Sequence, residues 1–562
     1  MNYEGFTGAA SKSKVSKRLV FPICLLFLIP MSTVPRLLFS SVFKPFAEAD
    51  NLYSRVDSKI EIFHNQLTKY QGVFSPRVHY STLGLHAIAN NLGVPSVVLD
   101  YPTLPRFIRE VKKGYDYVGI GSIAPNFERV KRMCVEIRRH SPKSKVIIGG
   151  FCATIEHLDR ILDVDYICQG EGISFMRELL GLPAEYEFRM PDCGARTAEI
   201  LGVPFFWDEY CAEAIVGLGC PYGCDFCAPS HFFGRKHIKF LKTGEAVFRE
   251  LTRLSARFKT DEIALMGDDN FLADEKRARE LHAIVKESGR TFKLFLFASA
   301  DRVSDWRPEE LAEMGAHNIW IGRESKFSPY AKNKNVNLRE LIAGLRRVGV
   351  NVILSSILLV DSHTKANIWE DVEDHLSCNP TFSQFSFYSP SPGTPLHNRL
   401  QKEGRLLTSI PLEDCHAFKR PWFIHPEFSL AEAEKMQDRA YLEDFHRLGP
   451  SMVRMMATEL EGHINLRESE SPVLRARAEM FARDFKRYRP LLKACAALAP
   501  TPEMAEHIRE SLTRLEKSSR KTSLVEAVEA LGLYAFGRAR TIRTSLFGDA
   551  LQPRTRFTNY SS

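Results

Sequence analysis

Between about residues 60 and 181, short β-branched apolar runs alternate with stretches in which apolar residues recur every three or four positions. The short runs predict buried strands, and the longer spacing predicts amphipathic helices. The alternation therefore predicts an α/β fold, a parallel sheet wound with helices on both faces. The predicted strands are 59–63, 96–100, 117–122, 145–150 and 165–170, and the predicted helices are 83–92, 104–113 and 127–140.

The predicted strands end in glycine or serine. In doubly wound sheets the ligand binds beyond the carboxyl ends of the strands. Glycine at such an end lets a large, flat ligand approach the backbone closely, although these residues would also suit ordinary loops. The residues at these ends are Ser122, Gly149, Gly150, Gly170, Glu171 and Gly172.

A second α/β series follows residues 183–212, which are rich in proline, glycine and acidic residues and predict a linker at 191–212. Six strand–helix repeats of this length predict a partial TIM-like barrel, whose active site lies at the carboxyl ends of its strands. The predicted strands are 214–219, 262–266, 293–298, 318–322, 350–359 and 384–388, with helices that include 243–258 and 338–348.

The strand pattern stops after about Leu407, and a helical C-terminal region follows. Its predicted helices are 430–459, 473–498 and 504–533. The segment 538–557 has five arginines and one aspartate, which predicts a solvated basic tail, with a phosphate- or lipid-binding segment as the alternative.

The N-terminus combines basic residues with an apolar run. Lys12, Lys14, Lys17 and Arg18 precede the apolar residues 19–34, which include two prolines. Three interpretations stay open: an interfacial membrane anchor, a buried segment, or a false start with Met31 as the true one.

Composition narrows the class of protein. The chain has 562 residues, of which 44% are hydrophobic and 26% charged, and this excludes wholesale disorder. The net charge of +8 permits an anionic partner without requiring one. Twelve cysteines are too few for a disulfide scaffold. The cysteine chemistry described below needs a reducing compartment, which favours the cytoplasm over export.

Three of these cysteines, Cys220, Cys224 and Cys227, follow the first barrel strand with spacings of three and two residues. Three thiolates cannot complete a four-ligand zinc site without a distant fourth residue. They can hold three irons of a 4Fe–4S cluster and leave the fourth iron open. The spacing, with Phe226 before the last cysteine, resembles the radical S-adenosylmethionine (SAM) family. The other cysteines form no second motif, so one cluster is predicted.

The resemblance extends along the barrel and implies a SAM site. Asp268 and Asp269 follow the second strand, Ser299 follows the third, and Glu324 closes the fourth. In the family these positions, together with the aromatic Phe226, contact SAM. The segment 389–395 resembles the Pro-Gly-Thr segment of cobalamin-linked members.

The N-terminal sheet resembles the cobalamin-binding domain of cobalamin-dependent (class B type) radical SAM enzymes. The resemblance covers residues 58–400. It implies that the residues at the strand ends bind cobalamin, namely Ser122, Gly149, Gly150, Gly170, Glu171 and Gly172. The chain lacks the Asp-x-His-x-x-Gly stretch that supplies the lower cobalt ligand in many cobalamin proteins. The implied organisation is an extension at 1–57, the cobalamin-binding-like domain at 58–190, the linker at 191–212, the barrel at 213–400, the helical domain at 401–535 and the basic tail at 536–562.

The resemblance implies an enzyme that cleaves SAM to a 5′-deoxyadenosyl radical and methylates an unactivated carbon of a small molecule or lipid. An electron donor such as flavodoxin or ferredoxin and peripheral membrane contact through the N-terminal apolar segment are also expected, and nucleic acid is not. Two alternatives remain: a radical SAM enzyme that rearranges, cyclises or couples its substrate, and a non-catalytic cobalamin or metal sensor.

Overall fold

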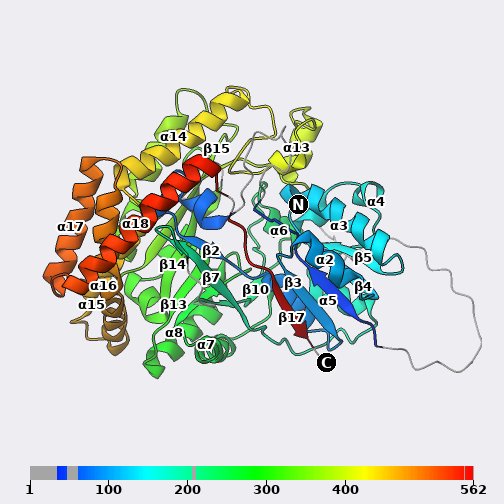
Figure 1. Ribbon diagram of the computed structural model, residues 1–562, viewed down its shortest axis with the longest axis horizontal. Helices are drawn as coiled ribbons and strands as arrows, with labels where there is room; N and C mark the ends of the chain where they lie inside the picture. The colour runs from blue at the N-terminus through cyan, green and yellow to red at the C-terminus, as the bar shows by residue number, and fades with distance from the viewer. Residues whose placement is uncertain are drawn as a thin grey trace, which may run out of the picture.

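The computed structural model describes residues 34–46, 61–204, 211–328, 330–333, 335–549 and 551–560. It contains a parallel sheet near the N-terminus, a larger sheet that forms the partial barrel, and a group of C-terminal helices (Figure 1). The predicted fold class is confirmed, and several element assignments change.

The first sheet has the strand order β17-β3-β1-β4-β5-β6, in which all neighbours are parallel except β17 and β3. Helices α1 and α5 pack on one face, and helices α2 and α3 pack on the other. The chain order reverses beside β1, which is where doubly wound sheets bind ligands. The strands are β1 Leu37–Ser40, β3 Ser96–Asp100, β4 Tyr117–Gly121, β5 Lys145–Gly149, β6 Tyr166–Ile167 and β17 Arg556–Tyr560, and the helices are α1 Leu83–Asn90, α2 Leu104–Val111, α3 Phe127–His140, α4 Leu158–Ile161 and α5 Gly172–Leu179.

The first strand of this sheet differs from the prediction. Residues 59 and 60 lie outside the described residues, and Ile62–Leu67 forms a π-helix instead of a strand. Glu61 is buried against Arg77, which suits a structural ion pair. The central strand is β1, which lies inside the predicted N-terminal extension, and its four residues are fully buried between β3 and β4.

Most of the apolar stretch 19–34 lies outside the described residues. Among the helices that are described, none has the length and apolar character needed to cross a bilayer.

The second sheet carries six consecutive parallel strands, β9 to β16, as predicted for a partial barrel. They are β9 Cys211–Ala214, β12 Glu262–Leu265, β13 Lys293–Ser299, β14 Ala316–Glu324, β15 Asn351–Leu358 and β16 Phe382–Phe387. The helices between them include α7 Gly244–Phe258, α8 Glu275–Ser288, α9 Ala300–Ser304, α10 Pro308–Met314, α11 Leu338–Arg347 and α12 Ile368–Ser377, and α13 Pro395–Lys402 follows β16.

The predicted linker contains strands. β7 (Cys193–Ile200) pairs antiparallel with β9 and also with β2 (Arg77–His79) and β8 (Val203–Pro204). The sequence of β7 has no continuous apolar run, so its strand structure depends on pairing with β9 and β2. The segment therefore extends the barrel sheet, which corrects the linker assignment.

The C-terminal region is helical, as predicted, but has more helices. The predicted helix 430–459 is broken at Gly449 and Pro450, and the predicted helix 504–533 is broken before Ser523, which caps a new helix with Glu526. The helices are α14 Leu430–Leu448, α15 Ser451–Leu466, α16 Pro472–Leu498, α17 Pro502–Ser518 and α18 Leu524–Phe547.

The predicted solvated tail is also wrong. Helix α18 continues to Phe547, and β17 (Arg556–Tyr560) pairs antiparallel with β3 at the edge of the first sheet. The chain thus crosses after α18 from the helical region to the N-terminal sheet, where β17 forms an edge strand (Figure 1).

Candidate functional site

The three-cysteine loop begins directly after β10 (Gly217–Leu218) and ends where α6 (Ala228–Phe232) begins. Gly219 has φ +76°, and a Cβ atom there would lie 2.7 Å from the Lys236 carbonyl oxygen, so the turn requires glycine. Cys220, Cys224 and Cys227 are all partly exposed thiols, whereas the other described cysteines, Cys211 excepted, are buried. The loop therefore brings three partly exposed cysteines together in one short segment.

The buried surroundings of this loop disfavour the negatively charged thiolate form of its cysteines when no cation is nearby. Burial raises the pKa of Cys227 to about 12 and raises the pKa values of Cys220 and Cys224. The three sulfurs would become thiolates only beside a cation, as iron provides. Within the described ranges, no three potential ligands gather as closely as a single metal ion needs. A cluster does not require that, because each cysteine binds a different iron, so these residues fit a 4Fe–4S cluster.

The two aspartates after β12 have different surroundings. Asp268 is fully buried, and its carboxylate lies 2.6 Å from Arg277 Nη2 and 3.0 Å from His237 Nε2. These partners outweigh burial and lower the pKa of Asp268. Both carboxylate oxygens of Asp268 are therefore bound by side chains of the protein. This arrangement does not fit the predicted contact between Asp268 and SAM.

Asp269 is partly exposed and faces the cysteine loop, where its charge acts on Cys220 and Cys227. Burial and the neighbouring Asp268 raise the pKa of Asp269 to about 7. The Gly219 backbone N–H and the nearby His237 oppose this rise only in part, and such a desolvated carboxylate is suited to bind a positively charged ligand group.

Ser299 ends β13 and belongs to a hydrogen-bonded group. The Asn270 amide donates to Ser299 Oγ over 3.1 Å, and the Ser299 backbone N–H donates to the Asn270 side-chain oxygen over 3.2 Å. Asn270 also hydrogen-bonds Cys220 and helps to lower the pKa of that thiol, against the larger effect of burial. Asn270 thus links the cysteine loop to Ser299, a role that the sequence analysis missed.

Glu324 ends β14 in the left-handed region, with φ +60°. Its carboxylate forms an ion pair with Lys332, and both side chains are nearly buried. Burial lowers the pKa of Lys332, but Glu324 and the thiol of Cys224 raise it overall. Lys332 thus places a positive charge between Glu324 and the cysteines, and nothing in its local sequence indicates this.

Phe226 packs edge-on against Tyr330 and Tyr388, with ring centroids 5.2 and 6.0 Å away. Both tyrosine hydroxyls donate to the Asp225 carboxylate, the Tyr388 bond over 2.7 Å. The aromatic residue of the motif is therefore fixed by β16 and by the segment after β14.

An apolar pocket of about 380 Å³ lies at the carboxyl ends of β4 and β5, within the size range of ligand pockets. All six predicted strand-end residues, Ser122, Gly149, Gly150, Gly170, Glu171 and Gly172, line it. Gly150 has φ +72°, and a Cβ atom there would lie 2.4 Å from the Ser122 carbonyl oxygen. The side chain of Glu171 caps α5 by accepting from the backbone N–H groups of Ile173 and Ser174.

The opposite wall of this pocket comes from the barrel. Leu218 precedes the first cysteine of the loop, and Phe232 and Phe233 follow the last one. The rings of Phe232 and Phe151 meet edge-on at 5.1 Å and join the two sheets at this point. A glycine-lined, apolar pocket that opens beside the cysteine loop fits a large, flat cofactor such as cobalamin.

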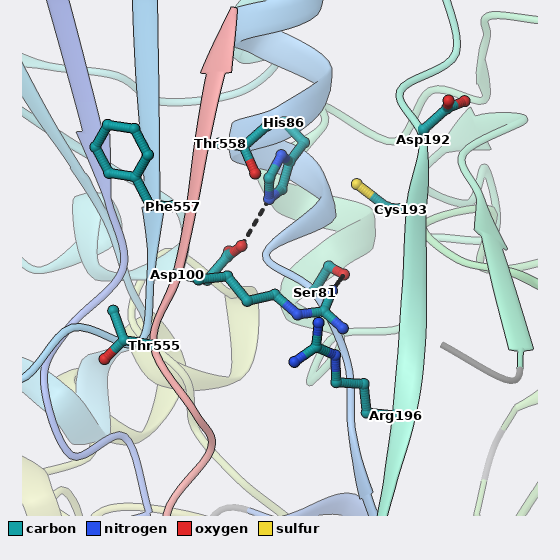
Figure 2. Close-up of a pocket in the computed structure, with 10 residues that line it drawn as sticks. Ser81, His86, Asp100, Asp192, Cys193, Arg196, Thr555, Phe557 and Thr558 are labelled. Carbon is teal, nitrogen blue, oxygen red and sulfur yellow. Dashed lines mark hydrogen bonds and ion pairs between the residues drawn. The ribbon is translucent and has the colours of Figure 1, made fainter. Parts of the chain in front are cut away.

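A second, polar pocket of about 350 Å³ lies between β3, β7, α1 and the C-terminal strand (Figure 2). His86 Nε2 is 2.8 Å from the Asp100 carboxylate, and His86 Nδ1 is 2.8 Å from the Tyr560 hydroxyl. Arg556 donates to Ser81 Oγ and to the Gly194 carbonyl oxygen over 3.1 Å each. These contacts attach β17 to both sheets, so the pocket has a structural role.

Comparisons with known proteins agree with this fold. No protein-family model matches the chain. A hopanoid C-2 methylase of Rhodopseudomonas palustris is 29% identical over 229 residues, which are 36% of this chain and 41% of that protein. A bacteriochlorophyllide d C-8(2)-methyltransferase of Chlorobaculum tepidum is 23% identical over 334 residues, which are 54% of this chain and 71% of that protein.

A third relative, a cytidylyl-2-hydroxyethylphosphonate methyltransferase of Streptomyces wedmorensis, is 29% identical over 228 residues, or 38% of either chain. The chain thus spans less than half the length of two of these three relatives. The structure of the radical S-adenosylmethionine methyltransferase TsrM from Kitasatospora setae, with cobalamin and a 4Fe–4S cluster bound, has a TM-score of 0.51 and 13% identity. The match covers 80% of this chain and 99% of that chain, and it shows a shared fold.

Proposed function

We propose that this protein is a cobalamin-dependent radical SAM methyltransferase that transfers a methyl group to an unactivated carbon. The proposal rests chiefly on the apolar pocket, whose walls come from the strand ends of the first sheet and from residues that flank the cysteine loop. A cofactor in that pocket would lie beside a cluster on the loop. Three sequence relatives that bear methyltransferase or methylase names also support it.

The residues of the chain would divide the work as follows. Cys220, Cys224 and Cys227 would hold the cluster and leave one iron open to SAM. When bound, the cluster supplies the electron that cleaves SAM, and cobalamin supplies the methyl group that the substrate receives. The protein then has to orient the reactants and exclude water.

Orientation of SAM would fall to residues on successive strand ends. The desolvated carboxylate of Asp269 would accept the SAM amino group, and the Ser299 hydroxyl, fixed by Asn270, would contact its polar groups. Glu324, held by Lys332, would bind the ribose hydroxyls, and Phe226 would pack against the bound molecule. Burial of these groups keeps bulk water from the reacting carbon.

The residues that line the pocket would offer no imidazole to a bound cobalamin. No residue that lines the described pocket is a histidine. The nucleotide tail would be buried between α1, α5 and the sheet, where Phe39 and Gly119 line the pocket. We therefore expect the cofactor to be bound base-off.

The proposed setting is the cytoplasm, because free thiols and an oxygen-sensitive cluster need a reducing compartment. An electron donor such as flavodoxin or ferredoxin would reduce the cluster. The substrate would be a small molecule or a lipid, since Leu218, Phe232 and Phe233 make the barrel side of the pocket apolar.

The test uses the full chain, purified without oxygen and with hydroxocobalamin present. Visible and electron paramagnetic resonance spectra report the cluster and the state of the cobalamin, and methyl-labelled SAM reports the products. Base-off cobalamin with both S-adenosylhomocysteine and 5′-deoxyadenosine as products would support the methyltransferase. Deoxyadenosine from protein that retains no cobalamin would overturn it in favour of a non-methylating radical enzyme.

A further inference from the structure

Helix α18 (Leu524–Phe547) packs on the protein through one side only. Glu526, Ala530 and Gly537 are its buried residues, and a Cβ atom on Gly537 would lie 2.7 Å from Leu498, so the helix approaches α16 closely. Arg540 holds the same side through Glu199 and Asp549, at 2.8 and 2.9 Å. The helix is therefore firmly placed, and its other side is free to meet a partner.

The free side of α18 is apolar along its whole length. Leu524, Val528, Leu531, Ile542 and Leu546 are 53–84% exposed and fall on one helical face, about 36 Å long. Of sixteen large hydrophobic residues exposed in the described parts of the chain, nine lie on this helix. They are Leu524, Val525, Val528, Leu531, Tyr534, Phe536, Ile542, Leu546 and Phe547, and we call them the α18 stripe. Scattered exposed leucines need no explanation, but a continuous stripe indicates a binding surface.

The charges around the stripe are mainly basic. Arg538 and Arg543 are exposed on α18, and Arg520 and Lys521 are exposed just before it. Glu526 is buried and paired with Arg489 and Arg520, which leaves Glu529 as the exposed acidic residue within the helix. An apolar stripe bordered by arginines is complementary to a surface that is apolar inside and anionic outside.

We propose that α18 docks the protein on an anionic lipid bilayer, lying in the plane of the headgroups with the stripe inserted. No described helix is long and apolar enough to span a membrane, so α18 lies on the surface. A second copy of the chain fits less well, because it would bring the same basic excess against itself. The site is separate from the proposed catalytic pocket and does not depend on the proposed function.

The test measures co-sedimentation of the full chain with vesicles of phosphatidylcholine alone or with 30 mol% phosphatidylglycerol, a composition of about one anionic lipid in three. The double variant L531E/I542E should lose at least tenfold in binding. The variant R538Q/R543Q should lose about 25-fold in binding on anionic vesicles only, because each basic residue near such a surface contributes about 1 kcal/mol, a roughly fivefold change. The matched control V135E/I161E alters exposed apolar residues elsewhere and should bind like the wild type.

Several results would overturn the proposal. A wild-type protein that stays in the supernatant with both vesicles would do so. Stripe variants that bind like the wild type would assign membrane contact to the N-terminal residues 1–33. A dimer in light scattering that L531E/I542E converts to a monomer, without vesicle binding, would assign the stripe to a second copy. Circular dichroism and cluster content should be unchanged in every variant, since the stripe is exposed.

Discussion

The guanidinium of Arg277 lies 2.6 Å from the Asp268 carboxylate, and neither side chain has any contact with solvent. Asp269, the next residue, accepts a hydrogen bond from the Gly219 backbone N–H and faces the cysteine loop, where its charge acts on Cys220 and Cys227. Two adjacent carboxylates at one strand end thus have different tasks: Asp268 fixes α8 to β12, and Asp269 is available to a ligand.

The first prediction separates these tasks. D268N removes the nearer counter-ion of the buried Arg277 and leaves Asp274 at 3.8 Å, so the free energy of unfolding should fall by about 3 kcal/mol, the lower end for a broken buried ion pair. D269N removes a carboxylate whose ionisation is disfavoured by burial, so it should leave the free energy of unfolding unchanged or raise it. It should weaken SAM binding by about tenfold or more, or about 1.4 kcal/mol. Thermal unfolding and equilibrium dialysis with SAM measure the two effects, and the reverse pattern would exchange the two roles.

The second prediction concerns the cluster. C220A, C224A and C227A should each fail to hold about four irons per chain after anaerobic reconstitution, because each removes one of three thiolates. C211A is the matched control, since Cys211 is partly exposed but lies in β9 away from the loop. It should keep its iron and its broad absorbance near ~400 nm, a feature of such clusters. A full cluster in any of the three loop variants contradicts the assignment.

The third prediction tests the pocket between the sheets. A Cβ atom on Gly149 would meet Cys168 at 3.7 Å, an ordinary contact, so the protein itself can accept a side chain there. G149V should nevertheless reduce cobalamin affinity by about tenfold or more, because the branched side chain competes for the pocket.

The control for G149V is G532V, on the exposed side of α18, where a Cβ atom has no neighbour within 4 Å. Cobalamin retained after desalting is read from the visible spectrum of both variants. Equal retention, with unchanged unfolding temperatures, would place cobalamin elsewhere.

The fourth prediction is a pH dependence. Burial raises the pKa of Glu213 to about 8, against weaker opposing hydrogen bonds from Ser81. Above the ordinary pKa of about 4.5 the unfolded chain releases a proton that the folded protein still binds at Glu213. The free energy of unfolding should therefore fall as the pH rises from about 4.5 to 8, and Glu213 should cause no further fall above pH 8.

E213Q keeps an acceptor for the Ser81 N–H, which donates to Glu213 over 3.0 Å. The unfolding temperature of E213Q relative to that of the wild type should increase from pH 5 to pH 8, by an amount equivalent to a few kcal/mol at most. A difference between the two proteins that stays constant over this range would show that Glu213 is not the group responsible.

The sequence by itself determined the features that depend on local pattern. The parallel strands β3, β4 and β5 contain short continuous apolar runs, as expected for strands whose two faces are both covered by helices. The three cysteines share one short loop, so their spacing alone predicts a common site. The glycines at the ends of β4 and β5 lie together because parallel strands end at the same edge.

Only the tertiary structure decided the features that depend on distant pairing. β1 has four residues, too few for a recognisable period, and it is a strand because Leu37–Ser40 pairs with β3 and β4 on both sides. β17 becomes a strand because Tyr560 pairs with Ser96, across most of the chain. The partner of Glu324 is Lys332, the partner of Asp268 is Arg277, and the side of α18 left uncovered is set by α16. These strand pairings, ion pairs and exposed surfaces depend on which parts of the chain come into contact after folding. The local pattern of apolar and polar residues does not predict those contacts.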